Sequence, residues 1–281
     1  MAHLEDAGSR SAAEPAAEKI RISLGSVWLL LERWLSVLIF LLVLCLWEWL
    51  VSAGRLSSLF FPAPSVILRT LLLWIFDGQL APHLAITLSR VLAGFVIGGV
   101  SGLFLGLVMG WSRRLRTVID PFIAATHPIP KISVLPLIMI IFGIGETSKM
   151  VVVAIAAFFP MVINTVAGVR QINPLYFEVT ENYGAKPIKV FRRVIIPGSL
   201  PLILAGMRLA LNSSLVITIA VELVAAERGL GALIWLAWET LRTEELYASL
   251  VVTAALGIGI NFFLQYLTKR LVPWSAAGAL E

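Results

Sequence analysis

Long apolar runs alternate with short polar segments along the chain. A helix needs about 20 mostly apolar residues to span the hydrocarbon core of a bilayer. The runs that meet this criterion are 34–53, 84–111, 121–144, 149–169, 200–225 and 246–267. The pattern predicts an all-α polytopic membrane protein with about six transmembrane helices, and we assign residues 33–272 to this membrane domain.

The segments outside these runs have other roles. Residues 1–32 are rich in Ala, Glu and Ser, which predicts a cytoplasmic N-terminal tail that leads into an interfacial segment. The first apolar run begins too late for a signal peptide, which favours a retained anchor. Residues 61–83 hold an apolar stretch that is too short to cross, which is typical of a helix lying at the membrane interface. Residues 273–281 are expected to form a C-terminal tail.

Glycines mark the second run and prolines mark the third. The glycines recur every four residues, so they share one helix stripe where another helix backbone can approach closely. Proline lacks an amide donor, so the third run is expected to be kinked or partly unwound. Broken helices occur beside translocation pathways and also at purely structural sites, and the pattern leaves both open. The residues are Gly94, Gly98, Gly102, Gly106 and Gly110 in the second run and Pro128, Pro130 and Pro136 in the third.

Composition supports a membrane protein. The chain is 59% hydrophobic and only 14% charged, with a mean hydropathy of +0.92, which excludes a soluble domain because a soluble surface needs polar cover. Cys45 is the single cysteine, so the chain cannot form an internal disulfide. The net charge is +5, but the basic residues are scattered among the apolar runs, so we expect membrane lipid and no nucleic acid as a partner.

The basic residues predict the orientation of the chain. Short cytoplasmic loops of membrane proteins are rich in Lys and Arg. With the N-terminus inside, fourteen Lys or Arg residues fall on inner segments and five on outer segments. Both termini are therefore predicted to be cytoplasmic.

The longest inner connection, residues 171–199, has the turn residues of two short helices. Asn173 can cap the first helix, with Pro174 at its first position. Gly184 can adopt the left-handed conformation that ends it. Pro187 can begin the second helix, and Pro197 is expected to end it.

The second short helix is amphipathic. Ile188, Phe191 and Ile195 share one face, and the basic residues Lys189, Arg192 and Arg193 lie elsewhere. Such a helix suits a groove in a partner protein, and it equally suits the membrane surface with its basic residues against lipid phosphates.

The same connection resembles the EAA loop of ABC importer permeases. Five residues separate Glu178 from Gly184, and nine more precede Val194-Ile-Ile-Pro197, although Val179 and Thr180 replace the two alanines of the motif. From about residue 61 to 274 the chain is similar to permeases of the nitrate, sulfonate and taurine importers. The matching segments are Phe-Pro-Ala-Pro-Ser from Phe61, Leu-Ser-Arg-Val-Leu-Ala-Gly-Phe from Leu88, Pro-Ile-Pro from Pro128, Phe-Gly-Ile-Gly-Glu from Phe142 and Glu-Arg-Gly-Leu-Gly from Glu227.

This resemblance implies a type I ABC importer permease fold and a transport role in a bacterial inner membrane. The loop would couple the membrane helices to a cytoplasmic ATPase through Glu178, Gly184, Ala185, Pro187, Phe191, Arg192 and Pro197. The chain has no Gly-x-x-x-x-Gly-Lys-Ser/Thr loop, so we expect no catalysis and no cofactor here, and ATP and Mg on the partner. The expected partners are two ATPase subunits, a second copy of this chain, and a periplasmic or lipid-anchored substrate-binding protein.

The expected cargo is a small anion such as a sulfonate, taurine or nitrate. Relatives of this permease type also carry aromatic acids or pyrimidine precursors, so those solutes remain an alternative. Polar residues within spans are costly and become candidates for a translocation pathway, although Ser and Asn also join helices. The candidates are Lys131, Arg208, Asn212, Ser213, Ser214 and Glu222.

Two other classes of protein fit the sequence less well. A membrane enzyme would need a polar catalytic cluster near one face, and an ion-coupled secondary transporter would need ionisable pairs at mid-membrane and internal repeats. We find none of these in the sequence. No convergent group of His, Asp and Glu predicts a metal site.

Overall fold

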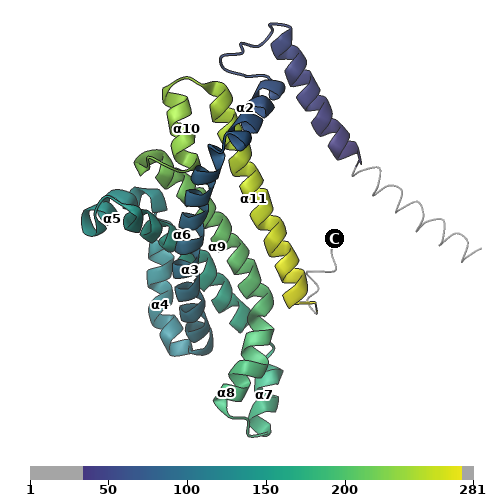
Figure 1. The fold of residues 1–281 in the computed structure, drawn as a ribbon. Coiled ribbons are helices and arrows are strands. Elements are labelled where there is room, and N and C mark those ends of the chain that lie inside the picture. Colours follow the sequence, from purple (N-terminus) through teal and green to yellow (C-terminus); the bar gives the residue numbers. More distant parts are fainter. Residues whose placement is uncertain (1–33, 274–281) are drawn as a thin grey trace, which may run out of the picture. The chain divides into compact units, whose positions relative to one another are not determined.

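The computed structural model describes residues 34–273 as a set of helices joined by short turns (Figure 1). The predicted N-terminal tail and residues 274–281 of the predicted C-terminal tail lie outside the described residues. Five helices of the described part are long and apolar enough to cross a membrane, or six if one bent pair counts as a span. The predicted all-α polytopic class is therefore confirmed. The five helices are Trp34–Ser52, α3 (Leu80–Trp111), α6 (Glu146–Arg170), Pro187–Ala225 and α11 (Thr243–Leu271).

The chain divides into two compact units, with the boundary between Leu68 and Arg69. In the first unit, Glu48 of the helix Trp34–Ser52 caps the start of α2 (Pro64–Phe76). The backbone N–H and the hydroxyl of Ser65 donate to its carboxylate over 3.0 and 2.7 Å. A carboxylate satisfies the unpaired amides at a helix N-terminus, which explains why a helix begins at this proline-rich segment. The short helix predicted here exists, and its place at the membrane interface stays a prediction.

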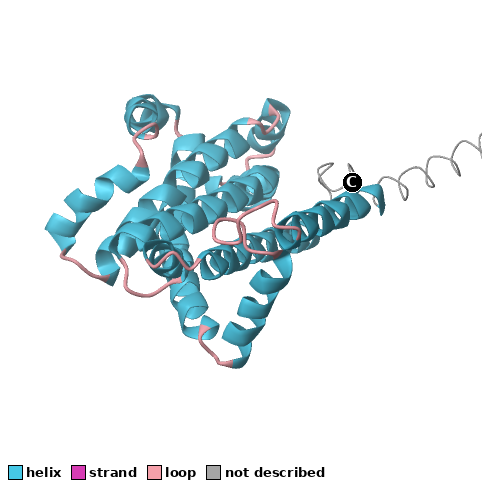
Figure 2. Ribbon diagram, turned by 90° about the horizontal axis from the view of Figure 1, so that it is seen from above, coloured by secondary structure: helices cyan, strands magenta, loops and turns pink. Residues whose placement is uncertain are grey.

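In the second unit, α6 lies between α3 and α9 (Ile196–Ala225), and α11 packs along α9 (Figures 1 and 2). Of the most apolar 18-residue stretch of α6, more than half of the residues are buried, whereas 17% are buried in the corresponding stretch of α11. The helix α6 therefore forms the centre of this unit.

The glycine stripe of α3 allows α6 to approach closely. A Cβ atom on Gly98 would lie 1.9 Å from the carbonyl oxygen of Ala154, and one on Gly102 would lie 2.7 Å from that of Phe158. The close packing predicted from the fourfold spacing is therefore confirmed, and the partner helix is α6.

The third apolar run is broken, as its prolines predict. The helix α4 (Arg113–Thr126) ends before Pro128, and the chain turns by 90° into η1 (Lys131–Val134) and α5 (Leu135–Phe142). The predicted start of this run at residue 121 is wrong. Ser112 accepts a hydrogen bond from the N–H of Leu115, so it caps a helix that begins eight residues earlier.

Candidate functional site

The first short helix of the predicted loop is α7 (Pro174–Asn182). The Asn173 side chain accepts a hydrogen bond from the N–H of Leu175 over 3.0 Å, and Pro174 stands at the start of the helix. Gly184 follows with a φ of +62°, a conformation that side chains with a Cβ rarely adopt. The predicted cap, start and turn are all confirmed.

The second short helix, α8 (Pro187–Val190), begins at the predicted proline, but it does not end at Pro197. It continues through the π-helical turn η2 (Phe191–Ile195) directly into α9, so Pro187–Ala225 is one helix of 39 residues. In the wide turn the N–H of Ile196 bonds to the carbonyl of Phe191. This bond shifts the hydrogen-bond register just before Pro197, which then stands at the start of an α-helical segment, where a missing N–H is tolerated.

The apolar face of this helix is used inside the subunit. Ile195 is 2% exposed and packs with Val169 of α6, and the ring of Phe191 stacks on Trp111 with centroids 5.5 Å apart. Ile188, which the periodicity places on the same face, is exposed. Phe191 therefore anchors the base of α8 to the end of α3.

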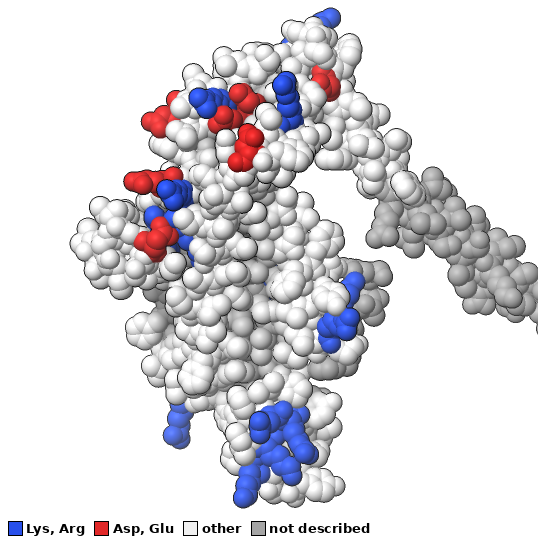
Figure 3. Space-filling model, viewed as in Figure 1, with Lys and Arg blue, Asp and Glu red and all other residues white. Residues whose placement is uncertain are grey.

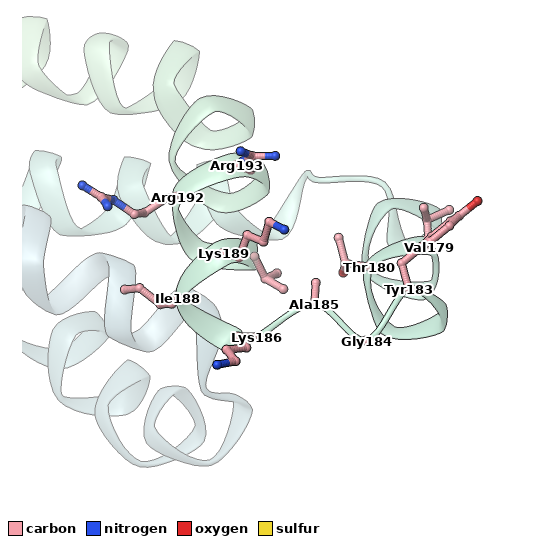
Figure 4. Close-up of a pocket in the computed structure, with 11 residues that line it drawn as sticks. Val179, Thr180, Tyr183, Gly184, Ala185, Lys186, Ile188, Lys189, Arg192 and Arg193 are labelled. Atoms are coloured by element: carbon pink, nitrogen blue, oxygen red, sulfur yellow. The ribbon is translucent and has the colours of Figure 1, made fainter.

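The helices α7 and α8 enclose a pocket of about 720 Å³, which we name the loop groove (Figure 4). Basic side chains gather on the surface around these two helices, where no acidic side chain is visible in Figure 3. Of the predicted coupling residues, Gly184, Ala185 and Arg192 line the groove. Glu178 is exposed on α7 outside the lining, and Pro187 begins α8. Phe191 and Pro197 do not line the groove either, and Pro197 lines a second pocket. The lining residues are Val179, Thr180, Tyr183, Gly184, Ala185, Lys186, Ile188, Lys189, Val190, Arg192 and Arg193.

The candidate pathway residues do not form one site. Lys131 lies at the break between α4 and η1, where its ammonium donates to the carbonyl of Ile129 over 2.8 Å and lies 4.4 Å from the ring centroid of Phe159. Asn212 bonds to Asn261 of α11 over 3.3 Å, which joins α9 to α11.

The remaining candidates on α9 differ in environment. The hydroxyl of Ser214 is buried and donates to the carbonyl of Ala210, which is a bond within the helix. Ser213 is half-buried. Arg208 is also half-buried, and within residues 34–273 its buried Nε has no hydrogen-bond partner. Arg208 thus remains a candidate for contact with a solute or another subunit.

Glu222 takes part in a buried network, and its role in a translocation pathway stays a prediction. Its side chain is 0% exposed, so its carboxylate is not available to a solute in this conformation. It accepts hydrogen bonds from the Arg90 guanidinium over 2.7 Å, from the Thr87 hydroxyl over 2.9 Å and from the Gly231 N–H over 2.9 Å. The burial follows from the close approach of α3 and the segment 229–231 to the end of α9.

Arg90 connects Glu222 to a second carboxylate. Its Nε and Nη2 atoms donate to the two oxygens of Glu146, the first residue of α6, over 2.6 and 2.7 Å. Lys149 donates to the same carboxylate over 2.9 Å. We name Arg90, Glu146, Lys149 and Glu222 the ion cluster. Its two positive and two negative charges balance, and it joins α3, α6 and α9 at the end of the bundle opposite α7 and α8.

Sequence reasoning missed Arg90 and Glu146, although both stand in the segments that carry the resemblance. A signal was present, because an arginine in an apolar run requires a carboxylate partner. The same cluster explains why a glycine stands at position 229 in the Glu-Arg-Gly-Leu-Gly segment. Gly229 has a φ of +130°, and a Cβ atom there would lie 2.3 Å from the Glu222 carboxyl carbon. Within the described chain, no group of three or more His, Cys, Asp or Glu residues could hold a metal ion.

Comparisons with known proteins agree with this geometry. A family model described as a binding-protein-dependent transport system inner membrane component matches residues 98–276. The taurine transport system permease protein TauC of Escherichia coli (strain K12) is 34% identical over 266 residues, which cover 92% of each chain. The putative aliphatic sulfonates transport permease protein SsuC of Bacillus subtilis (strain 168) is 32% identical and covers 83% of this chain and 84% of its own.

Solved structures show the same fold. The MetNI methionine ABC transporter in an inward-facing conformation superimposes with a TM-score of 0.59 at 20% sequence identity, covering 66% of this chain and 92% of that one. An amino acid ABC transporter gives a TM-score of 0.54 at 20% identity, covering 70% and 95%. The predicted type I ABC importer permease fold is thereby confirmed. The extent of the family match and the identity to the curated permeases show that this chain belongs to the binding-protein-dependent transport inner membrane components, the permease subunits of ABC importers.

Proposed function

We propose that this chain is the permease of an importer for taurine or a related aliphatic sulfonate, driven by cytoplasmic ATPase subunits that bind the end carrying α7 and α8. The observation that carries the proposal is the coupling loop. It combines a capped short helix, a left-handed glycine turn and a groove lined by basic residues, and it continues without interruption into a membrane span. ATP and Mg²⁺ would be held by the ATPase partner.

The continuous helix supports a direct mode of coupling. Pro187–Ala225 has 39 residues, or about 58 Å at 1.5 Å per residue. A displacement of α8 by a closing ATPase would therefore move α9 as well, without a flexible joint between them. The ion cluster holds the far end of α9 against α3 and α6, so the movement would reach the whole bundle.

The proposed cargo rests on the relatives. TauC and SsuC are named for taurine and aliphatic sulfonates, and both align over most of this chain. A sulfonate is an anion, which agrees with the expectation of a small anionic cargo. Nitrate, aromatic acids and pyrimidine precursors have no counterpart among these relatives, and they serve as competitors in the test.

The proposed assembly is a symmetric pair of this chain with two ATPase subunits and an external substrate-binding protein. If the bent pair counts as one span, the six spans are half of the usual twelve-span pore, and closed twofold symmetry is the commonest form of assembly. The free side of α9 supports a pairing of spans, since Leu209, Val216 and Val224 are 51%, 66% and 70% exposed. We place the pair in a bacterial inner membrane with both termini in the cytoplasm.

The first experiment identifies the partners. The tagged chain is purified from its native membrane in mild detergent, and stoichiometric companions are identified by mass spectrometry. An ATPase that carries a phosphate-binding loop is the expected companion. A chain that comes out alone and transports without ATP after reconstitution would replace the importer with an ion-coupled secondary transporter.

A second experiment identifies the cargo. The complex is reconstituted in liposomes with its binding protein, and uptake of labelled taurine is measured against unlabelled competitors. Alkanesulfonates are expected to compete, and nitrate and aromatic acids are expected not to. Uptake that only an aromatic acid or a pyrimidine precursor blocks would contradict the sulfonate assignment.

A further inference from the structure

The loop groove has an unbalanced charge. Four of its eleven lining residues are basic and none is acidic. They are Lys186, Lys189, Arg192 and Arg193. Within residues 34–273 none of these four side chains takes part in an ion pair or a side-chain hydrogen bond. By contrast, the charges of the ion cluster at the other end of the bundle are paired and balance.

The positions of the basic residues add to the imbalance. Lys189 precedes Arg192 by three residues and Arg193 by four on one helix. Like charges at these spacings repel each other and weaken the helix. Glu178 and Glu181 of α7 form no ion pair with them, so this part of the helix is stabilised when an anionic group enters the groove.

The side chains on the two sides of the groove differ in length. Lys189 and Arg193 point across the groove from the α8 side, whereas Arg192 points away from it (Figure 4). The small side chains of Thr180 and Ala185 face them from α7 and the turn. Long cations opposite short neutral residues leave room for a carboxylate side chain from another molecule. The volume of about 720 Å³ lies within the range of pockets that bind drug-sized ligands, so a short peptide segment fits.

The length of the helix that carries α8 favours a place for the groove outside the bilayer. The helix Pro187–Ala225 is about 58 Å long, whereas a bilayer with its headgroups is about 40–45 Å thick. The helices α7 and α8 project past the end of α11, whose last turn carries Lys269 and Arg270 (Figure 1). Basic residues at the end of a span mark the headgroup level. This position favours an aqueous protein partner over a lipid headgroup.

We propose that an acidic segment of the partner ATPase enters the loop groove and pairs its carboxylates with Lys189 and Arg193. The proposal rests on the function proposed above and adds the chemistry of the contact. The ATPase does not only receive α8 in a cleft of its own, but also inserts Asp or Glu side chains between α7 and α8. The contact is electrostatic, so its strength falls as ionic strength rises.

Carbodiimide cross-linking of the purified complex tests the contact directly. This reagent joins a carboxylate to a lysine amine only where the two already touch. Mass spectrometry is expected to find Lys189 or Lys186 joined to an Asp or Glu of the ATPase, and Lys269 not joined to it. A complex that contains the ATPase but yields no cross-link at either groove lysine would overturn the proposal.

Charge reversal supplies the second test. The double variant Lys189→Glu/Arg193→Glu is expected to weaken ATPase retention by about tenfold or more, because attraction becomes repulsion. The exchange Lys189→Arg/Arg193→Lys keeps both charges and is expected to retain the ATPase. The matched control is Arg113→Glu/Arg114→Glu, two exposed residues at the start of α4 outside the groove, which should bind like the unaltered chain. Gel filtration first establishes that each variant is folded.

The outcomes separate the two proposals. If the unaltered chain retains no ATPase, the proposed function fails. If it retains the ATPase and the reversed variant retains it equally at every salt concentration, only the groove proposal fails. Retention is also compared in detergent and in nanodiscs with and without phosphatidylglycerol. If the reversed variant loses the ATPase only in nanodiscs with phosphatidylglycerol, the groove binds a lipid headgroup and the proposed ATPase contact is overturned.

Discussion

Replacement of Glu222 by leucine tests the ion cluster with a magnitude that follows from its contacts. The change removes the carboxylate that pairs with Arg90 and leaves the Thr87 hydroxyl and the Gly231 N–H without this acceptor. Removing one partner of a buried ion pair costs about 3–5 kcal/mol. Glu146 still pairs with Arg90, but the cluster is left with two buried cations and one carboxylate, so one positive charge stays uncompensated. For a chain of this size 1 kcal/mol shifts the melting temperature by about 2–4 °C, so Glu222→Leu is expected to melt roughly 6–20 °C lower.

The double variant Arg90→Met/Glu222→Leu distinguishes a lost ion pair from lost packing. It leaves no buried charge without a partner, since Glu146 is 48% exposed and still lies 2.9 Å from Lys149. Removing both partners of a buried pair is often close to neutral, so the double variant is expected to melt above the single one.

Thermal unfolding in detergent, followed by fluorescence-detected gel filtration, measures both variants. The control is Glu245→Leu, which breaks the more exposed pair with Arg242, worth at most about 1 kcal/mol. The reasoning is refuted if Glu222→Leu melts within about 2 °C of the unaltered chain, the range of a surface substitution. It is also refuted if the double variant melts no higher than the single one.

Three further predictions concern the packing of the helices and the coupling loop. Gly98→Ala forces a Cβ atom against the Ala154 carbonyl, so stability should fall by about 1–3 kcal/mol and the melting temperature should be lower. The control Gly259→Ala, which has open space around it, should leave the melting temperature unchanged. Gly184→Val strains the turn by about 1–2 kcal/mol and should lower ATP-driven uptake while the spans stay inserted, and full uptake would contradict the role of this turn. Phe191→Ala removes about 1 kcal/mol of stacking on Trp111 and should speed proteolysis within 171–199 while α3 remains protected, so unchanged cleavage would show that the stack does not anchor the loop.

Much of this fold follows from local patterns. The length of each apolar run determines whether it can span a bilayer, which is why the predicted spans lie within a few residues of the helices. The exceptions are the broken third run and the fifth, whose helix begins at Pro187 and not near residue 200. The glycine stripe, the Asn173 cap and the Gly184 turn could also be predicted, since each depends on residues close together in the chain.

The features that could not be predicted depend on contacts between distant segments. Pro197 looks like a helix end in the sequence, but the helix continues past it through a π turn. At this turn Ile195 packs against α6 and Phe191 packs against α3, and these contacts join segments that are distant in the sequence. The buried pairing of Glu222 could not be predicted because its partner Arg90 lies 132 residues away. A pattern within one run does not reveal which other run supplies the opposite charge.

The long sequence separation between Arg90 and its two carboxylate partners affects how the chain inserts into the membrane. Arg90 lies in α3, which leaves the ribosome before either of its carboxylate partners, and an arginine within a span makes insertion unfavourable by a few kcal/mol. At about 5–20 residues per second, Glu146 is synthesised roughly 3–11 s later and Glu222 roughly 7–26 s later. The order of translation therefore sets the order of neutralisation, and the first helix pair able to settle in lipid is α3 with α6. The last step waits for α9, so a chain truncated before Glu222 should keep α3 and α6 paired through Glu146 alone and engage the insertion machinery for longer.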